Sequence, residues 1–182
     1  MVFFLIQLNP HVHRRQKSEL LTMGKKTAVV YFSLTGHTQA VAEIVQEVLD
    51  ADIIALKPIK SLNSKSSMKF VWGGYQAKMN KTPDLEPYEF DVEKYGFIIL
   101  GSPVWAWTLS PPMRSFLKQH DLTNKKVAFW MGSMGPKKKA AERFKKALPE
   151  CNLVGELHLQ GTHEENWGEN YRKAKEWAQT LQ

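Results

Sequence analysis

Hydroxyl side chains and a glycine lie between the first apolar run and the first helical pattern, in the order Ser33, Leu34, Thr35, Gly36, His37, Thr38. The first backbone N–H groups of a helix have no partner within it, and the helix dipole places roughly half a positive charge there. Hydroxyls add donors, and Gly36 lets the backbone bend around an anion. The pattern predicts a phosphate cradle, and an ordinary threonine cap beside a turn glycine is the alternative.

Two common nucleotide-binding loops do not fit this segment. A Walker A loop needs a lysine directly after its last glycine, and no lysine follows Gly36. The dinucleotide fingerprint G-x-G-x-x-G is also absent after the first apolar run. Without that lysine or a magnesium ligand, triphosphate hydrolysis is disfavoured. The segment favours a single terminal phosphate.

Two further segments follow apolar runs and have residue types suited to a planar ligand. One runs from Gly101 to Thr108 and carries Trp105 and Trp107, whose indoles offer flat faces for stacking. The other, 132–135, reads Gly-Ser-Met-Gly, so its backbone can approach a polar ring edge. Ligands of open α/β sheets bind at the carboxyl ends of strands. Tryptophans that plug the sheet edge and a plain strand-to-helix turn are the alternatives.

The elements that must position these segments alternate along the chain. Short apolar runs of the kind buried on both sheet faces occur at 28–32, 53–56, 97–100 and 127–131, and a more alternating run at 153–159 suggests an edge strand. Apolar stripes with helical spacing follow at 41–49, 111–117, 140–148 and 167–181, and we expect these stripes to be core contacts. This order predicts an α/β fold with a three-layer, doubly wound sheet of five parallel strands.

Three regions stand apart from that alternation. Residues 1–24 form an N-terminal extension that we expect to be poorly ordered, before a domain at 25–182. Residues 58–90 are polar and glycine-interrupted, so we expect at most a short helix near 67–78. The lone Cys151 excludes an internal disulfide, and its position suggests no nucleophilic role. No run is long enough to predict a membrane span.

The chain resembles the flavodoxin family in two stretches and in its order of elements, over about residues 25–181. Residues 29–45 (VVYFSLTGHTQAVAEIV) resemble the flavodoxin phosphate loop, and 98–117 (IILGSPVWAWTLSPPMRSFL) resemble the second flavin-contacting loop of small bacterial flavodoxin-like proteins. The resemblance implies strand order 2-1-3-4-5 and one non-covalent FMN. It assigns the phosphate to Ser33, Thr35, Gly36, His37 and Thr38, and the isoalloxazine to Pro103, Val104, Trp105, Ala106 and Trp107, with Gly132, Ser133 and Gly135 at its other side.

One departure from the family pattern concerns the second loop. Many flavodoxins have a glycine after the aromatic residue there, and its peptide flips toward flavin N5 upon reduction. Ala106 follows Trp105 in this chain, which puts that flip in doubt. Trp72 and Tyr75, in the polar 58–90 segment, are further candidates to cover the ring, with a packing role as the alternative.

The net charge of the chain helps to distinguish an oxidoreductase from an electron carrier. The formal net charge is +7, whereas carrier flavodoxins are typically acidic, and cations gather at 57–81 and 125–146. This balance favours an FMN-dependent oxidoreductase that takes electrons from NAD(P)H or a redox partner protein, with a non-catalytic electron carrier as the alternative. No general acid or base stands out. No nucleic-acid motif accompanies the lysines, the spacing of His158, His163 and Glu164 suits no metal site, and we expect a cytoplasmic protein.

Overall fold

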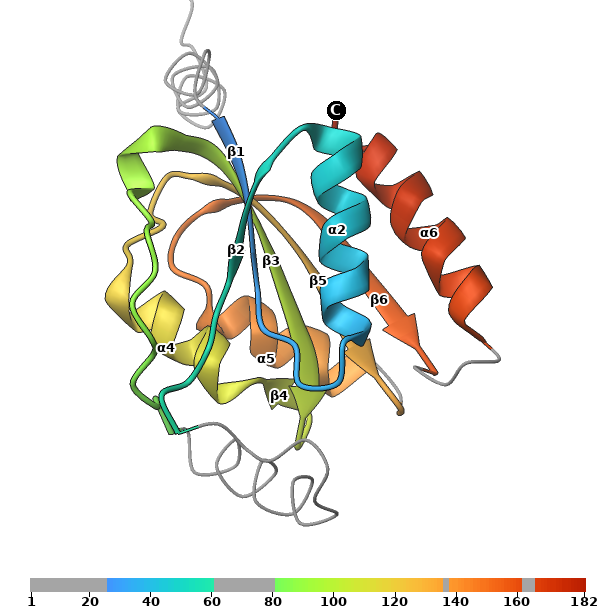
Figure 1. The fold of residues 1–182 in the computed structure, drawn as a ribbon, viewed down its shortest axis with the longest axis horizontal. Coiled ribbons are helices and arrows are strands. Elements are labelled where there is room, and N and C mark those ends of the chain that lie inside the picture. The colour runs from blue at the N-terminus through green and yellow to red at the C-terminus, as the bar shows by residue number, and fades with distance from the viewer. Residues whose placement is uncertain (1–25, 61–80, 136–137, 162–165) are drawn as a thin grey trace, which may run out of the picture.

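Five parallel strands follow the five apolar runs. A computed structural model describes residues 26–60, 81–135, 138–161 and 166–182. The strands are β1 (Lys26–Tyr31), β2 (Asp52–Ala55), β3 (Tyr95–Trp105), β5 (Lys126–Ser133) and β6 (Asn152–Gln160). Their order is β2-β1-β3-β5-β6, with every neighbouring pair parallel (Figure 1). Counted along the chain as five strands, this is the predicted order 2-1-3-4-5, and β6 lies at the edge as its alternation suggested.

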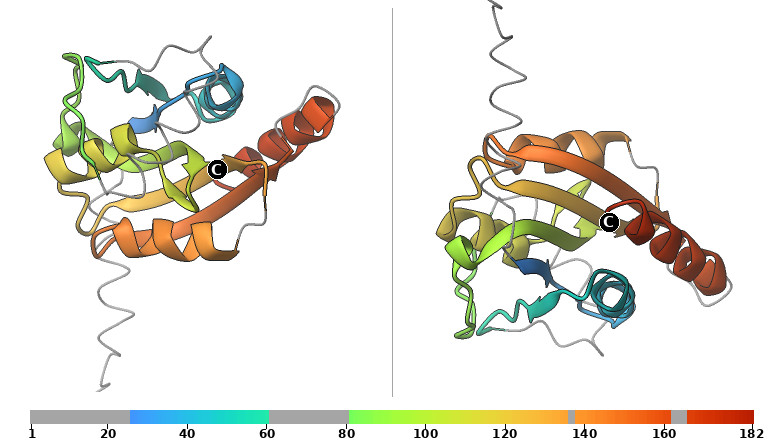
Figure 2. Two further views of the ribbon diagram at one scale, coloured as in Figure 1. Left: turned by 90° about the horizontal axis from the view of Figure 1, so that it is seen from below. Right: turned by 90° about the horizontal axis from the view of Figure 1, so that it is seen from above.

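The four α-helices within the described ranges cover the two faces of this sheet. Helices α2 (His37–Leu49) and α6 (Trp167–Gln179) lie on one face, and α4 (Pro111–Gln119) and α5 (Lys138–Ala147) on the other (Figure 2). The strands alternate between two hydrophobic clusters accordingly. Val29 and Trp130 face α2 and α6, whereas Val30 and Phe129 face α4 and α5. The predicted three-layer α/β fold is therefore confirmed.

One part of the fold differs from the sequence prediction. Instead of ending near Leu100, β3 continues to Trp105 and turns back into a short antiparallel strand, β4 (Thr108–Leu109). The predicted turn is thus only two residues long, Ala106 and Trp107. The extension is possible because β3 lies between β1 and β5, and β5 continues to pair with it as far as Pro103. The fully buried Ser102 accepts the N–H of Ser110 at 3.0 Å and fixes the base of this hairpin.

The helical stripes are core contacts with two exceptions. In α6, Ala174 and Ala178 are buried as predicted, but Tyr171 is 46% exposed and points away from the sheet. Trp167, at the start of the same helix, lines a cavity and also packs against the hydrophobic cluster. The extension at 1–24 and the expected helix at 67–78, with Trp72 and Tyr75, lie outside the described residues. None of the described helices is long and apolar enough to cross a bilayer.

Candidate functional site

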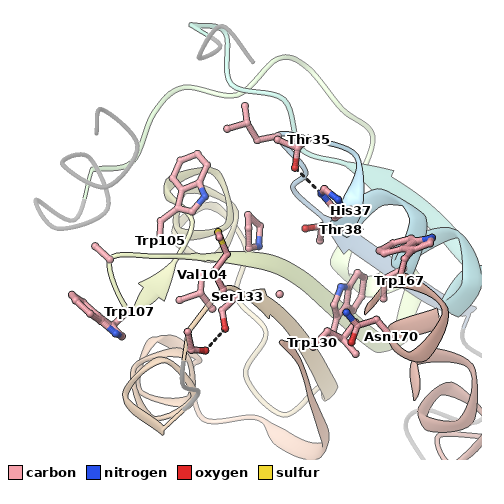
Figure 3. Close-up of a pocket in the computed structure, with 18 residues that line it drawn as sticks. Thr35, His37, Thr38, Val104, Trp105, Trp107, Trp130, Ser133, Trp167 and Asn170 are labelled. Atoms are coloured by element: carbon pink, nitrogen blue, oxygen red, sulfur yellow. Dashed lines mark hydrogen bonds between the residues drawn. The ribbon is translucent and has the colours of Figure 1, made fainter. Parts of the chain in front are cut away.

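A cavity of about 490 Å³ opens where β1, β3 and β5 end, within the range of small-molecule sites (Figure 3). Its wall comes from the loop before α2, the β3–β4 hairpin, the end of β5 and the start of α6. The lining residues are Leu34, Thr35, His37, Thr38, Val41, Pro103, Val104, Trp105, Ala106, Trp107, Trp130, Gly132, Ser133, Met134, Gly135, Leu159, Trp167 and Asn170. The strand ends of the sheet thus converge on one pocket.

The amino end of α2 forms one wall of this pocket. Gly36 has φ of +92°, which favours glycine, and its N–H donates to Ser33 Oγ at 3.1 Å. The helix has no side-chain cap and no acidic residue in its first turn, so its first free N–H groups have no competing anion there. The Thr35 hydroxyl and His37 Nδ1 lie 2.9 Å apart, and Thr38 is 7% exposed on the pocket wall. This end of α2 can accept an anion.

The β3–β4 hairpin forms a second, aromatic wall. The Trp105 indole meets the Phe32 ring edge-on, with ring centroids 5.5 Å apart. Trp107 is 57% exposed, and Figure 3 places the two indoles on different sides of the hairpin. Ala106 and Trp107 both have positive φ, 48° and 58°, in a turn that normally selects asparagine or glycine. Arg143 Nη1 donates to the Ala106 carbonyl oxygen at 3.2 Å and supports this strained turn.

The end of β5 forms a third wall through Gly132, Ser133 and Gly135. The Ser133 hydroxyl donates to the Gly135 carbonyl oxygen at 2.7 Å and lies 2.6 Å from His158 Nε2. Because a hydroxyl has one hydrogen, the second bond requires that His158 Nε2–H donates to Ser133. Met134, which follows Ser133, lines the pocket and is 66% exposed.

Most of the predicted binding residues meet in this pocket. The residues that the resemblance assigned to FMN all line it except Ser33 and Gly36, which instead shape the loop before α2. Sequence reasoning missed Leu34, Val41, Trp130, Met134, Leu159, Trp167 and Asn170 as lining residues. For Asn170 there was a signal, a polar residue one turn from Ala174 on the inward face of α6. It is 4% exposed and donates to the carbonyl oxygens of Gln160 and Gly161.

Trp130 shows how closely the pocket floor is packed. It lies opposite Gly101 on the neighbouring strand, and a Cβ on Gly101 would lie 2.0 Å from the indole Cζ2. The residue at position 101 must therefore be glycine for the indole to lie there. The indole N–H is buried and has no acceptor in the part of the chain that the structure describes. A bound ligand with an acceptor atom would satisfy it.

The pocket contains little charge. Among the described residues that line it, His37 is the only titratable side chain, and no lysine or arginine is present. No group of three metal-ligating side chains gathers within the described ranges, and His163 and Glu164 lie outside them. Burial raises the pKa of the Cys151 thiol, which lowers its thiolate fraction, and Cys151 does not line the pocket. The chemistry available here is binding by amides, hydroxyls and indoles.

Several solved protein structures have a fold similar to this one. A crystal structure of a flavoprotein from Lactobacillus acidophilus in complex with FMN matches with a TM-score of 0.67 and 23% identity, covering 85% of this chain and 99% of that one. The NMR structure of the apo-form matches with a TM-score of 0.60 and 25% identity, covering 80% and 98%. A Bacteroides uniformis protein matches with a TM-score of 0.68 and 23% identity, covering 85% and 97%.

The comparison with curated proteins found no match. The family model for flavodoxin matches residues 26–173, which includes every wall of the pocket and all five parallel strands. The chain belongs to the flavodoxin family.

Proposed function

We propose that this protein binds one FMN non-covalently in the pocket and transfers electrons through it. The observation that carries the proposal is the division of the pocket wall. An uncapped helix amino end with hydroxyls and no lysine forms one end, and aromatic residues surround the other. A phosphate and a planar ring need these two environments in one cavity.

The residues present fit FMN. Thr35, His37 and Thr38, with the first N–H groups of α2, would hold the phosphate, while Ser33 and Gly36 keep the loop in shape. The hairpin residues 103–107, which include Trp105 and Trp107, would flank the isoalloxazine, and 132–135 would contact its other side. The buried Trp130 N–H offers a donor that the described protein leaves unused. FMN supplies the redox chemistry, and the protein binds it, orients it and limits its contact with water.

Two comparisons support FMN as the cofactor. The chain belongs to the flavodoxin family over residues 26–173, and the structurally similar Lactobacillus acidophilus flavoprotein was solved in complex with FMN. Among the described residues that line the pocket there is no lysine, arginine, aspartate or glutamate, which also suits a neutral ring system.

The reaction we propose is an FMN-dependent oxidoreduction driven by NAD(P)H or by a redox partner protein. The net charge of +7 supports this assignment, because a positive field stabilises the reduced, more anionic flavin. The alternative is a non-catalytic electron carrier. The exposed Trp107 and Met134 at the pocket mouth favour it, since a carrier passes electrons at an accessible edge.

The cofactor is tested by titrating the purified protein with FMN and with riboflavin, which lacks the phosphate. Quenched flavin fluorescence and shifted absorption bands with FMN, and much weaker binding of riboflavin, are expected. No saturation with FMN after attempted reconstitution would overturn the proposal.

Anaerobic mixing of the FMN-loaded protein with NADPH or NADH then separates enzyme from carrier. Bleaching of the flavin band by either nucleotide supports an NAD(P)H-dependent oxidoreductase. If neither nucleotide bleaches the flavin band, the partner-dependent oxidoreductase and the electron carrier remain.

A further inference from the structure

One flank of α5 carries a row of cations. Lys139, Arg143 and Lys146 are spaced by four and three residues, so they lie on the same side of the helix. All three are exposed, and none forms an ion pair with another residue that the structure describes. The neighbouring Lys145 differs, because it pairs with Glu156 at 2.8 Å. We call Lys139, Arg143 and Lys146 the basic stripe.

The basic stripe contacts the wall of the pocket. Its middle residue, Arg143, donates to the carbonyl oxygen of Ala106, which lines the pocket. The next residue, Trp107, is 57% exposed, and Met134 is 66% exposed. Both line the pocket and are exposed at its mouth, and we call these two residues the Trp107–Met134 lip. Figure 1 shows α5 beside β4, in agreement with the Arg143 contact.

This combination is typical of a protein-binding surface. Tryptophan, methionine and arginine are enriched at the centres of protein interfaces. Charged residues at the rim of an interface, such as lysine, steer a partner of opposite charge. The stripe covers eight residues, from Lys139 to Lys146, and so extends about 10 Å along the helix. Its cations lie in a row on a convex helix, whereas a nucleotide phosphate needs donors that converge on one point. An acidic protein fits the stripe better than a nucleotide does.

We propose that the basic stripe and the Trp107–Met134 lip form the docking surface for an acidic redox protein. This inference rests on the proposed function, because the lip is useful for electron transfer only when a flavin lies behind it. Electrons then cross the lip between the flavin and the partner's redox group.

The test uses the full-length FMN-loaded protein, reduced with dithionite, and two haem proteins as probes. One probe is a soluble b-type cytochrome of net negative charge, and the other is the positively charged cytochrome c. The flavin gives one electron to each of two ferric haems, which become ferrous, and it releases the protons acquired on reduction. Stopped-flow absorbance of the haem follows the rate at low and high salt.

Two double variants carry the same change in net charge, from +7 to +3. K139E/K146E reverses the basic stripe and leaves Arg143 in place. K118E/K175E reverses exposed lysines of α4 and α6 that do not line the pocket. FMN titration of both variants checks that the cofactor still binds.

Raising the salt concentration should slow the reduction of the acidic cytochrome by the wild-type protein and should not slow the reduction of cytochrome c. K139E/K146E should slow the acidic cytochrome about tenfold or more, whereas K118E/K175E should change its rate less than twofold. High salt should remove the difference between wild type and K139E/K146E.

Equal slowing by both variants would overturn the proposal, because net charge alone would then explain the rate. A rate with the acidic cytochrome that rises with salt would overturn it as well. If the protein binds no FMN at all, the proposed function has failed. If FMN binds and the stripe is neutral to the rate, only the docking surface has failed.

Discussion

Thr38 is the residue on which a phosphate assignment can be tested most directly. It is 7% exposed in the first turn of α2 and lines the pocket. T38V keeps the shape of the side chain and removes its hydroxyl. A hydrogen bond to a charged group contributes about 1.5–3 kcal/mol, so we expect the Kd for FMN to rise about tenfold or more. Fluorescence-quench titration measures this change.

Riboflavin provides the control for Thr38 because it lacks the phosphate. Its affinity should be the same in T38V and wild type. T27V, on β1 outside the pocket, should leave both ligands unaffected. Equal weakening of FMN and riboflavin by T38V would show that Thr38 does not contact the phosphate.

At the residue scale, the sequence predicted most of the binding side chains near strand ends and missed most of those deeper within helices and strands. Thr38 lies two residues after Gly36, and Trp105 lies at a strand end, where the pattern of residue types is unusual. Trp130 reads as an ordinary core residue in an apolar run, and only its register opposite Gly101 places it on the pocket floor. Register between distant strands depends on tertiary contacts, so a local pattern cannot predict it.

The β3–β4 hairpin holds a strained turn between the end of β3 and the short strand β4. Ala106 has φ of 48° without the freedom of glycine. Left-handed backbone costs an L-residue about 1–2 kcal/mol, and glycine's larger unfolded-state entropy offsets roughly half of that gain. We therefore expect A106G to raise the free energy of unfolding of the apoprotein by about 0.5–1 kcal/mol. Urea denaturation followed by far-UV circular dichroism measures it.

A141G is the matched control for A106G, because it makes the same substitution inside helix α5. It should lower the free energy of unfolding by about 1 kcal/mol, since glycine is a poor helix former. Destabilisation by A106G to the same extent would mean that the turn is not strained.

The C-terminal end of α4 gives the fold a dependence on pH. His120 caps this helix among the rings of Tyr88, Phe90 and Phe116, and burial lowers the pKa of its imidazole below the ordinary value of 6.5. Below that value the unfolded chain binds a proton that the folded chain does not. The stabilising contribution is thus complete above about pH 6.5 and is lost as the pH falls toward the pKa of the folded state.

Urea midpoints at pH 7.5 and 5.5 test this effect of His120. The urea midpoint of the wild-type protein should be lower at pH 5.5 than at pH 7.5. In H120F the fall should be smaller, because phenylalanine keeps the ring contacts and does not titrate. Tyr88 can still donate to Gln119 Oε1, so this variant leaves its hydroxyl with an acceptor. An identical fall in both proteins would exclude His120 as the source.

At the element scale, the strands and helices were predictable where their periodicity is strong. The apolar runs at 28–32 and 127–131 became β1 and β5, and the stripe at 41–49 became α2. The hairpin was not predictable, since Ala106 and Trp107 are not residues that favour such a turn. Two helices support the hairpin. Arg143 of α5 donates to the Ala106 carbonyl oxygen, and Arg114 of α4 donates to Thr108 Oγ1.

For the whole molecule, the sequence predicted the layers because every central strand is apolar on both faces. A parallel sheet of five strands with helices on both faces follows from that alternation. The order itself came from the family resemblance. The position of the pocket follows from this order. The strand order reverses between β1 and β3, and ligands of such sheets bind at the carboxyl ends of the strands beside that point.

The same layering predicts that FMN stabilises the molecule as one unit. The pocket wall joins α2 and α6 to β3 and β5, whose alternate residues belong to both hydrophobic clusters. Ligand at 100 times its Kd adds about 2.7 kcal/mol, which corresponds to a rise in Tm of roughly 5–10 °C for a chain of this size. Tryptophan fluorescence, which reports on the pocket, and far-UV circular dichroism, which reports on the sheet and helices, should give the same Tm with FMN. Riboflavin at the same concentration should raise it less, because the amino end of α2 gains nothing from a ligand without phosphate. Two separate transitions in FMN would show that the pocket unfolds independently of the sheet, contrary to the shared clusters.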